Sequence, residues 1–273
     1  MISYSCDQNR DEISVSGIKQ FLAYPEASEN IILFEEIDST SREAKKLAIS
    51  GCAHGTVILA NRQSAGKGRR GRSFFSPPYS GIYMSVILDN AVFQFSSPTA
   101  VTAYTALCVC DAIESVCDLI PSIKWVNDII LDGKKIGGIL TEAVTALKTH
   151  TVSAFIIGIG INVSTKTSDF PVILQKHAGS IYPDGNAPVS RNQLVAEIIN
   201  RLFYGDKPDE GLLFEQYKER LFMLGTDILV IQENNMYMAR ALDINDQGHL
   251  IIKKRNGETV LLLSGEISIL SGE

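Results

Sequence analysis

Hydrophobic and polar positions divide the chain into a long part of mixed periodicity and a short part with strand periodicity alone. Alternating apolar residues predict strands, and apolar residues three and four apart predict helices. In the long part we predict strands at 31–37, 56–60, 81–88, 123–131, 135–142 and 152–161, and helices at 15–22, 39–50, 98–118, 190–204 and 210–223. From residue 226 we predict only short strands, at 228–232, 236–245, 250–254 and 259–263. This pattern is typical of an α+β chain that ends in a compact β module, which we expect to be a small barrel.

Residues with strong turn and cap preferences mark several boundaries. Pro98 suits the first turn of a helix, and Gly51 is placed to end one. The pair Asp132-Gly133 predicts a tight hairpin between two strands. Ser190-x-x-Gln193 has the form of a capping box and predicts the start of a helix.

The composition is that of a globular protein with one large or two modest domains: 273 residues, 45% hydrophobic and 21% charged. We find no uninterrupted apolar run of about 18 residues, so we expect no membrane partner. The polar N-terminus is unlike a signal peptide. Five cysteines without a C-x-x-C pair predict a reduced, cytoplasmic protein in which thiols are buried as small hydrophobes.

One segment is strongly positive, although the net charge of the chain is −6. Residues 66–72, GKGRRGR, contain three glycines and four cations. Glycines let backbone N–H groups approach a ligand, and arginine forks suit phosphate or carboxylate, so the segment predicts an anion site. A solvated basic face or a nucleic-acid patch is the alternative. The segment is no Walker A loop, and Val163 rules out a dinucleotide fingerprint at 158–163.

Other polar residues lie at predicted strand ends. Asn127 and Asp128 interrupt the apolar run 123–131, where an unpaired carboxylate is unfavourable, and they therefore suggest a site. Gly137-Gly138 inside a strand suggests close approach of a ligand. Each of the remaining candidates also has a structural explanation: helix caps for Ser39 and Thr40, a strand-end cap for Asn162, an edge-strand charge for Lys135 and a core position for Trp125.

The ordered motifs DST, Q-x-A-G-K-G-R-R-G-R-x-x-F-S-P, KWVND, GKKIGGIL-x-E, GIGIN and SGEISI together resemble the biotin–protein ligase family. The resemblance covers about residues 31–270. It implies a class II synthetase-like catalytic domain on a mixed sheet, followed by a small SH3-like barrel. The implied domains are an N-terminal extension at 1–30, a catalytic domain at 31–223 and the barrel at 224–273.

The resemblance also implies a reaction. Biotin and ATP would be the substrates, with Mg²⁺, and would give biotinyl-5′-AMP and pyrophosphate. A lysine of a biotin carboxyl carrier protein would then accept the biotinyl group. The implied partners are that carrier and a second copy of the chain, paired edge to edge through the sheet.

Site residues follow from the matched motifs. The resemblance implies catalytic roles for Lys135, Asp128 and Arg69, and a Mg²⁺ role for Asp128. The implied biotin-binding residues are Ser39, Thr40, Ser41, Gln63, Lys67, Gly68, Arg69 and Lys135. The implied ATP- and adenylate-binding residues are Arg69, Arg72, Phe74, Asn127, Lys135 and Asn162.

Four positions depart from the family pattern. Lys67 stands where many members have arginine, Phe74 where they often have tryptophan, and Val126 where they commonly have proline. Leu270 stands where some members have an arginine of the barrel that reaches ATP, so the resemblance implies no such contact from this barrel.

Two other functions compete with this reading. A lipoate or octanoyl ligase of the same superfold is one, although KWVND, GKKIGGIL and the barrel favour biotin. A biotin-responsive transcription regulator is the other. Some bacterial family members carry an N-terminal winged helix-turn-helix of about 60 residues, and only about 30 residues precede the first catalytic strand here. Together with the acidic net charge, this predicts no specific DNA binding.

Overall fold

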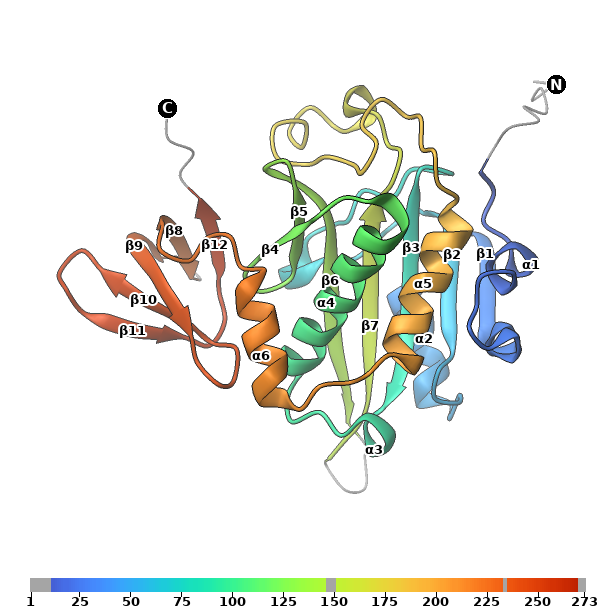
Figure 1. Ribbon diagram of the computed structural model, residues 1–273, viewed down its shortest axis with the longest axis horizontal. Helices are drawn as coiled ribbons and strands as arrows, with labels where there is room; N and C mark the ends of the chain where they lie inside the picture. Colours follow the sequence, from blue (N-terminus) through green and yellow to red (C-terminus); the bar gives the residue numbers. More distant parts are fainter. Residues whose placement is uncertain (1–10, 146–150, 233–234, 270–273) are drawn as a thin grey trace.

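The computed structural model describes residues 11–145, 151–232 and 235–269. Its larger sheet has seven strands in the spatial order β1-β2-β3-β7-β6-β5-β4 (Figure 1). The strands are β1 (Ile31–Ile37), β2 (Val57–Gln63), β3 (Gly81–Asp89), β4 (Ser122–Lys124), β5 (Asp128–Leu131), β6 (Lys134–Thr145) and β7 (Val152–Asn162). Only β1 and β2 pair in parallel, and the other five neighbouring pairs are antiparallel. The predicted mixed sheet is confirmed.

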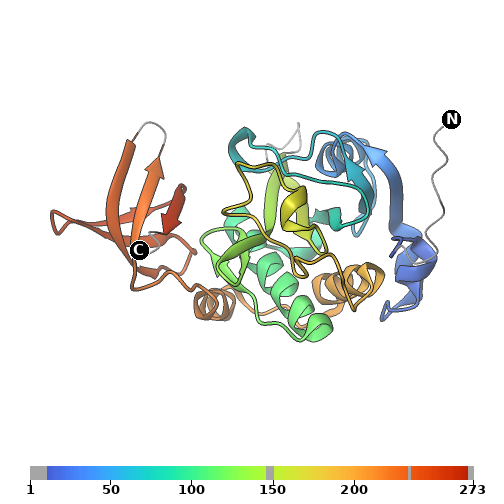
Figure 2. The same cartoon turned by 90° about the horizontal axis from the view of Figure 1, so that it is seen from above.

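Helices cover both faces of this sheet. The long helix α4 (Pro98–Cys117) lies on one face with α5 (Arg191–Tyr204) and α6 (Glu210–Glu219), and α2 (Thr40–Ile49) lies on the other (Figures 1 and 2). The shorter elements are α1 (Val15–Lys19), η1 (Pro25–Asn30), η2 (Arg69–Gly71), α3 (Asn90–Phe93) and η3 (Thr167–Asp169).

Strand alternation assigns each face its chemistry. On β3, Ile82, Met84, Val86 and Leu88 belong to the large core on the α4 face. Ile87 points the other way, into a smaller cluster under α2. The alternation that predicts a strand at 81–88 thus also identifies the core face.

Helix α4 is the central helix of the main core. By length and composition alone it could cross a membrane, with a mean hydropathy of 1.4, but 72% of its apolar window is buried inside the protein. Its Cys108 and Cys110 are buried, and burial raises the pKa of both thiols to about 12. These two cysteines are the small hydrophobes that the sequence predicts.

The C-terminal strands form a second, five-stranded antiparallel sheet. They are β8 (Asp227–Gln232), β9 (Asn235–Ile244), β10 (Leu250–Lys254), β11 (Thr259–Leu262) and β12 (Glu266–Ile269), in the order β11-β10-β9-β8-β12. Strand β12 is not among the predicted strands. The module lies beside α6, at the opposite end of the molecule from α1 (Figure 1).

The turn between β9 and β10 fastens this module to the larger domain. Gly248 in that turn sits so close to Phe214 of α6 and Thr99 of α4 that an added Cβ would clash with the Phe214 ring. Its carbonyl accepts a 2.9 Å hydrogen bond from the indole Nε1 of Trp125. Trp125 is therefore a buried residue that joins the two sheets.

The segment before β1 packs on the larger domain. Ile13, Ile18 and Leu22 belong to the main core. Arg191, fully buried at the start of α5, donates to the carboxylate of Asp11 and to the carbonyl of Gly81. These contacts tie the segment to α5 and to β3.

Several boundaries differ from the prediction: β2 and β6 each extend three residues further, to Gln63 and Thr145. Residues 125–127 form a turn, so the run 123–131 is the hairpin β4–β5 instead of one strand. Helix α6 ends at Glu219, and α1 ends at Lys19. For the turn, the cause lies in tertiary contacts. Partners from elsewhere in the chain bury its apolar side chains, so the run is apolar although the turn is not part of a strand.

Caps and turns follow the prediction more closely. Asp132 and Gly133 both have positive φ, as their hairpin turn requires, and Gly51, with φ of 87°, follows Ser50, the C-cap of α2. Ser190 caps α5 by accepting from the amide of Asn192. Ser39 occupies the cap position of α2, but its side chain makes no cap hydrogen bond. Cys6 and Leu270 lie outside the described residues.

We predict that Trp125→Phe lowers the free energy of unfolding by about 1–3 kcal/mol, because it leaves the buried Gly248 carbonyl without its donor. Urea denaturation followed by circular dichroism measures the change. Tyr204→Phe, at a half-exposed position on α5, is the control and should unfold like the parent. Equal stability of all three proteins would show that this bond does not hold the module.

Candidate active site

A cleft opens on the face of the large sheet that carries α2. Its free volume is about 920 Å³, part of it open to solvent. Gly158 and Gly160 of β7 and Gly138 of β6 line it. On β7 these glycines alternate with buried isoleucines of the main core. The cleft therefore exists because these three glycines leave part of one face of the central strands without side chains, and the close approach of a ligand to Gly138 stays a prediction.

One end of the cleft is a chain of hydroxyl and amide groups. The Gln63 side-chain oxygen accepts from both the amide and the hydroxyl of Thr40, at 2.9 and 3.1 Å. Ser85 on β3 donates to the Thr40 hydroxyl and lies 3.1 Å from that of Ser41. Gln63 in turn donates to Ser76. Because each group fixes its neighbour, this end presents polar atoms in defined orientations to a small polar ligand.

The basic segment is a closed hairpin over the cleft. Lys67 and Ser73 form an antiparallel bridge, and the Gly68 amide donates to the Arg72 carbonyl at 2.7 Å. Arg70 and Gly71 have φ of 54° and 74°, which makes the tight turn at its tip. Glycine suits position 71 of this turn because it adopts positive φ without strain.

Two of the four cations in this hairpin are held by groups outside it. Arg69 donates to the side-chain oxygen of Asn127 at 2.9 Å, and Asn127 donates in turn to the Ile139 carbonyl. Arg72 pairs with Glu266 of β12. Burial, followed by the nearby charge of Arg70, lowers the pKa of Arg69. The hairpin is thus connected to both sheets.

A bulge aims Lys135 into the cleft. In the β5–β6 pairing, Ile129 faces Gly137 and Ile130 faces Lys135, so β6 has one extra residue at Ile136. The extra residue resets the alternation, and Lys135 comes to lie on the same face as Gly138.

The Lys135 ammonium is paired with a buried carboxylate. Lys135 Nζ lies 2.6 Å from Asp128 Oδ1, and Lys124 Nζ lies 3.1 Å from Oδ2. Burial acts to raise the pKa of Asp128, but the charges of Lys135 and then Lys124 outweigh it and hold that pKa below its ordinary value. Asp128 is therefore ionised at neutral pH.

Phe74 packs inside the cleft. Its ring covers Gly160 so closely that an added Cβ there would clash, and it meets Tyr83 edge-on with ring centroids 6.3 Å apart. The aromatic face that the resemblance assigns to adenine lies in the cleft.

Most of the candidate residues converge here. Thr40, Ser41, Gln63, Lys67, Gly68, Arg69, Arg72, Phe74, Asn127, Asp128 and Lys135 all line the cleft. Ser39 and Asn162 do not. Ser39 is fully buried at the start of α2, and Asn162 donates to the Gly179 carbonyl at the end of β7. Ser39 Oγ and Asn162 Oδ1 are buried without a partner among the described residues.

Sequence reasoning misses two charged residues of the cleft, Lys124 and Glu266, and the buried Ser85 behind it, which contacts Thr40 and Ser41. Ser85 alternates with core residues, so its position on β3 could have revealed it. Lys124 opens the motif KWVND, but a lysine near a strand end reads as a solvated charge. Glu266 is far away in the sequence and carries no local signal.

The donor set around Asp128 does not fit Mg²⁺. Both carboxylate oxygens already accept from ammonium groups, whose positive charges would repel a dication. Within the described part of the chain there is no group of three or more His, Cys, Asp or Glu side chains that could hold a metal ion.

Known proteins share this architecture. The profile of the Biotin/lipoate A/B protein ligase family matches residues 33–162. The bifunctional ligase/repressor BirA of Bacillus spizizenii is 32% identical over 254 residues, covering 90% of this chain and 76% of the relative. The biotin–[acetyl-CoA-carboxylase] ligase of Mycobacterium tuberculosis is 25% identical, with 84% and 85% covered.

A solved structure agrees in fold. The biotin protein ligase from Aquifex aeolicus, determined in complex with biotin and ATP, superimposes with a TM-score of 0.73 at 24% identity. The superposition covers 89% of this chain and all of that one. The matched profile and the relative that is 32% identical show that the chain belongs to the Biotin/lipoate A/B protein ligase family, among its biotin–protein ligases.

Proposed function

We propose that this protein is an ATP-dependent biotin–[acetyl-CoA-carboxylase] ligase, which activates biotin as biotinyl-5′-AMP and transfers it to a lysine of a carrier protein. One observation carries the proposal. Cations from β4, β6 and the basic hairpin line one cleft, whose other end is a fixed set of hydroxyl and amide groups. The polar head of biotin matches the hydroxyl and amide groups at one end of the cleft. Its carboxylate and the triphosphate of ATP match the cations at the other end.

The first step joins two anions. A biotin carboxylate oxygen attacks the α-phosphorus of ATP, the bond from that phosphorus to the bridging oxygen of the β-phosphate breaks, and pyrophosphate leaves. Lys135 and Arg69 offset the repulsion between the reactants, because both line the part of the cleft next to Asp128. Positioned cations in a poorly hydrated site are worth several kcal/mol to such a step.

The second step consumes the adenylate. The neutral amine of the acceptor lysine attacks the biotinyl carbonyl carbon, the bond from that carbon to the phosphate oxygen breaks, and AMP leaves as the amine loses a proton. A mixed anhydride is sensitive to water, so cover over the cleft is useful. The basic hairpin, joined to β12 through Arg72 and Glu266, is placed to provide it.

For the residues that line the cleft we propose the roles that the motifs imply, with the exception of the Mg²⁺ role of Asp128. Thr40, Ser41, Gln63, Lys67 and Gly68 would bind biotin, and Arg72, Phe74 and Asn127 would bind the nucleotide. Ser39 and Asn162 would take part only by supporting the cleft, since neither lines it. A cytoplasmic site of action and an edge-to-edge homodimer remain parts of this proposal.

The direct test is incubation with ATP, Mg²⁺, biotin and a biotin carboxyl carrier domain, read by intact mass. We expect the carrier to gain one biotinyl group. Parallel incubations with lipoate or octanoate in place of biotin distinguish this activity from that of the other ligases in the family. Transfer of lipoyl or octanoyl alone would overturn the proposal.

We predict that Lys135→Ala reduces biotin-dependent pyrophosphate release by at least about 100-fold, because it removes the cation aimed at the carboxylate–phosphate pair. Lys253→Met, which alters an exposed lysine of β10, should leave the rate unchanged. Circular dichroism checks that both variants are folded. Near-normal release by Lys135→Ala would remove this lysine from the mechanism.

A second candidate function is biotin-responsive DNA binding, because several relatives are named bifunctional ligase/repressor. We predict no specific complex with the operator of biotin synthesis genes, since the chain carries a net charge of −6. Gel shifts at physiological salt, with and without biotin and ATP, measure this. A specific complex that responds to biotin would establish the regulator instead.

A further inference from the structure

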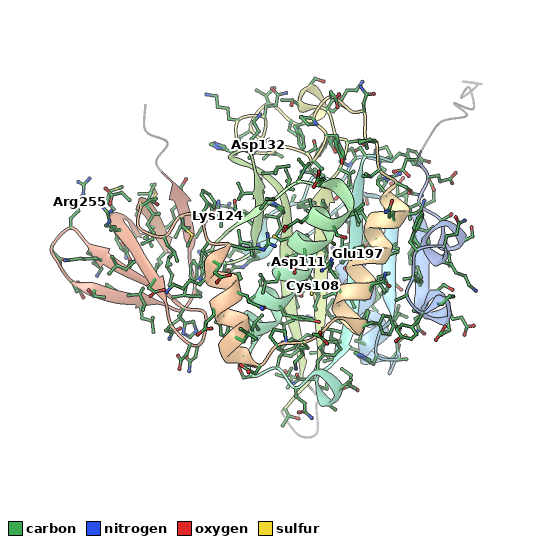
Figure 3. The ribbon with its side chains drawn as sticks, viewed as in Figure 1. Cys108, Asp111, Lys124, Asp132, Glu197 and Arg255 are labelled. Carbon is green, nitrogen blue, oxygen red and sulfur yellow. The ribbon has the colours of Figure 1, made fainter. Side chains whose placement is uncertain are left out.

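Lys124 and Lys135 share one buried carboxylate. Strand register places Lys124 of β4 directly opposite Asp128 of β5. Its ammonium lies 3.1 Å from one carboxylate oxygen, and that of Lys135 lies 2.6 Å from the other. Figure 3 shows Lys124 at the boundary between the large sheet and the C-terminal module. The motif resemblance gives a role to Asp128 and to Lys135 but none to Lys124.

The three side chains are exposed to different degrees. Asp128 is 15% exposed, Lys124 22% and Lys135 38%. A carboxylate this deeply buried is strongly unfavourable without a cation beside it. The other charged or titratable groups that act on Asp128 are Arg69, from the hairpin, and Tyr217, from α6. Arg69 is already engaged by Asn127.

We infer that Lys124 is a positioning residue that frees Lys135 to act, an inference that rests on the proposed function. Lys135 has to turn from Asp128 toward the carboxylate–phosphate pair. With Lys124 in place, Asp128 keeps a counter-ion when Lys135 turns away. Because Lys124 already neutralises part of the Asp128 charge, the attraction between Asp128 and Lys135 is weaker before Lys135 turns. Lys135 is the more exposed of the two lysines and is therefore the one that moves.

The same geometry gives Asp128 the role of anchor for two lysines instead of that of a metal ligand. Mg²⁺ requires oxygen ligands at about 2.0–2.1 Å in octahedral geometry and readily keeps its water molecules. Both oxygens of Asp128 are already engaged by ammonium groups. Asp128 is therefore no ligand of Mg²⁺ in this inference.

The test separates turnover from binding. We expect Lys124→Met to lower kcat for biotin-dependent pyrophosphate release about 10- to 100-fold, because Lys135 stays on Asp128. KM for biotin and for ATP should change less than about threefold. Lys124→Arg should restore most of kcat because it keeps the charge, and Lys253→Met is again the control. A change in KM alone would overturn the inference, since Lys124 would then be a substrate contact.

A double-mutant cycle tests whether Lys124 acts through Asp128. Once Asp128→Asn has removed the shared anion, loss of Lys124 should matter little, so the double variant should match Asp128→Asn within about threefold. Effects that multiply instead would show that Lys124 acts independently and would overturn the inference.

Magnesium dependence tests the anchor role separately. The Mg²⁺ concentration for half-maximal rate should differ between Asp128→Asn and the parent by less than about threefold, and a rise of about tenfold would make Asp128 a metal ligand. Parent protein that forms no biotinyl adenylate would overturn the proposed function and this inference with it. An active parent with an unaltered Lys124→Met variant would overturn this inference alone.

Discussion

The side-chain alternation of the central strands is the constraint on which the rest of the molecule depends. On β7, Ile157, Ile159 and Ile161 face the main core, while Gly158 and Gly160 face the cleft. Each buried isoleucine stabilises the fold by about 1.5–3 kcal/mol, whereas a glycine within a strand costs only about 0.5–1 kcal/mol. The isoleucines on the core face therefore stabilise the strand, while the glycines on the opposite face leave room for a ligand.

The cleft is also lined by several cations, and most of them contact a carboxylate or an amide oxygen. Lys135 and Lys124 share Asp128, Arg72 is held by Glu266, and Arg69 is held by an amide oxygen of Asn127. Unpaired cations this close together would repel one another. These partners hold the cations at fixed positions, from which they can turn toward an anionic ligand.

Much of this arrangement follows from local sequence. Alternation on β3 and β7, the Asp132-Gly133 turn and the glycines of the basic hairpin all act through the backbone, so the sequence predicts them directly. The cap position of Ser39 is also predicted, although its hydroxyl plays no part in capping.

The turn at residues 125–127 could not be predicted in the same way. Trp125 donates to Gly248, and the carbonyl of Val126 accepts from Tyr217. Both partners lie about a hundred residues away in the chain, so the local run KWVND reads as part of a strand. The contact of Lys124 with Asp128 is unpredictable for the same reason, because only the turn brings the two residues opposite each other.

The C-terminal module is part of the site as well as an attached domain. In the pairing of β12 with β8, Glu266 lies opposite Ile231, and Gly265, Glu266 and Ile267 line the cleft. The module thus supplies the carboxylate that holds Arg72, and its Gly248 carbonyl fixes the Trp125 that begins the turn before Asp128. A five-stranded module has a thin core of its own and is stabilised by docking on α6 and α4. Docking therefore does two things with the same contacts: it stabilises the module, and it completes the charged end of the cleft.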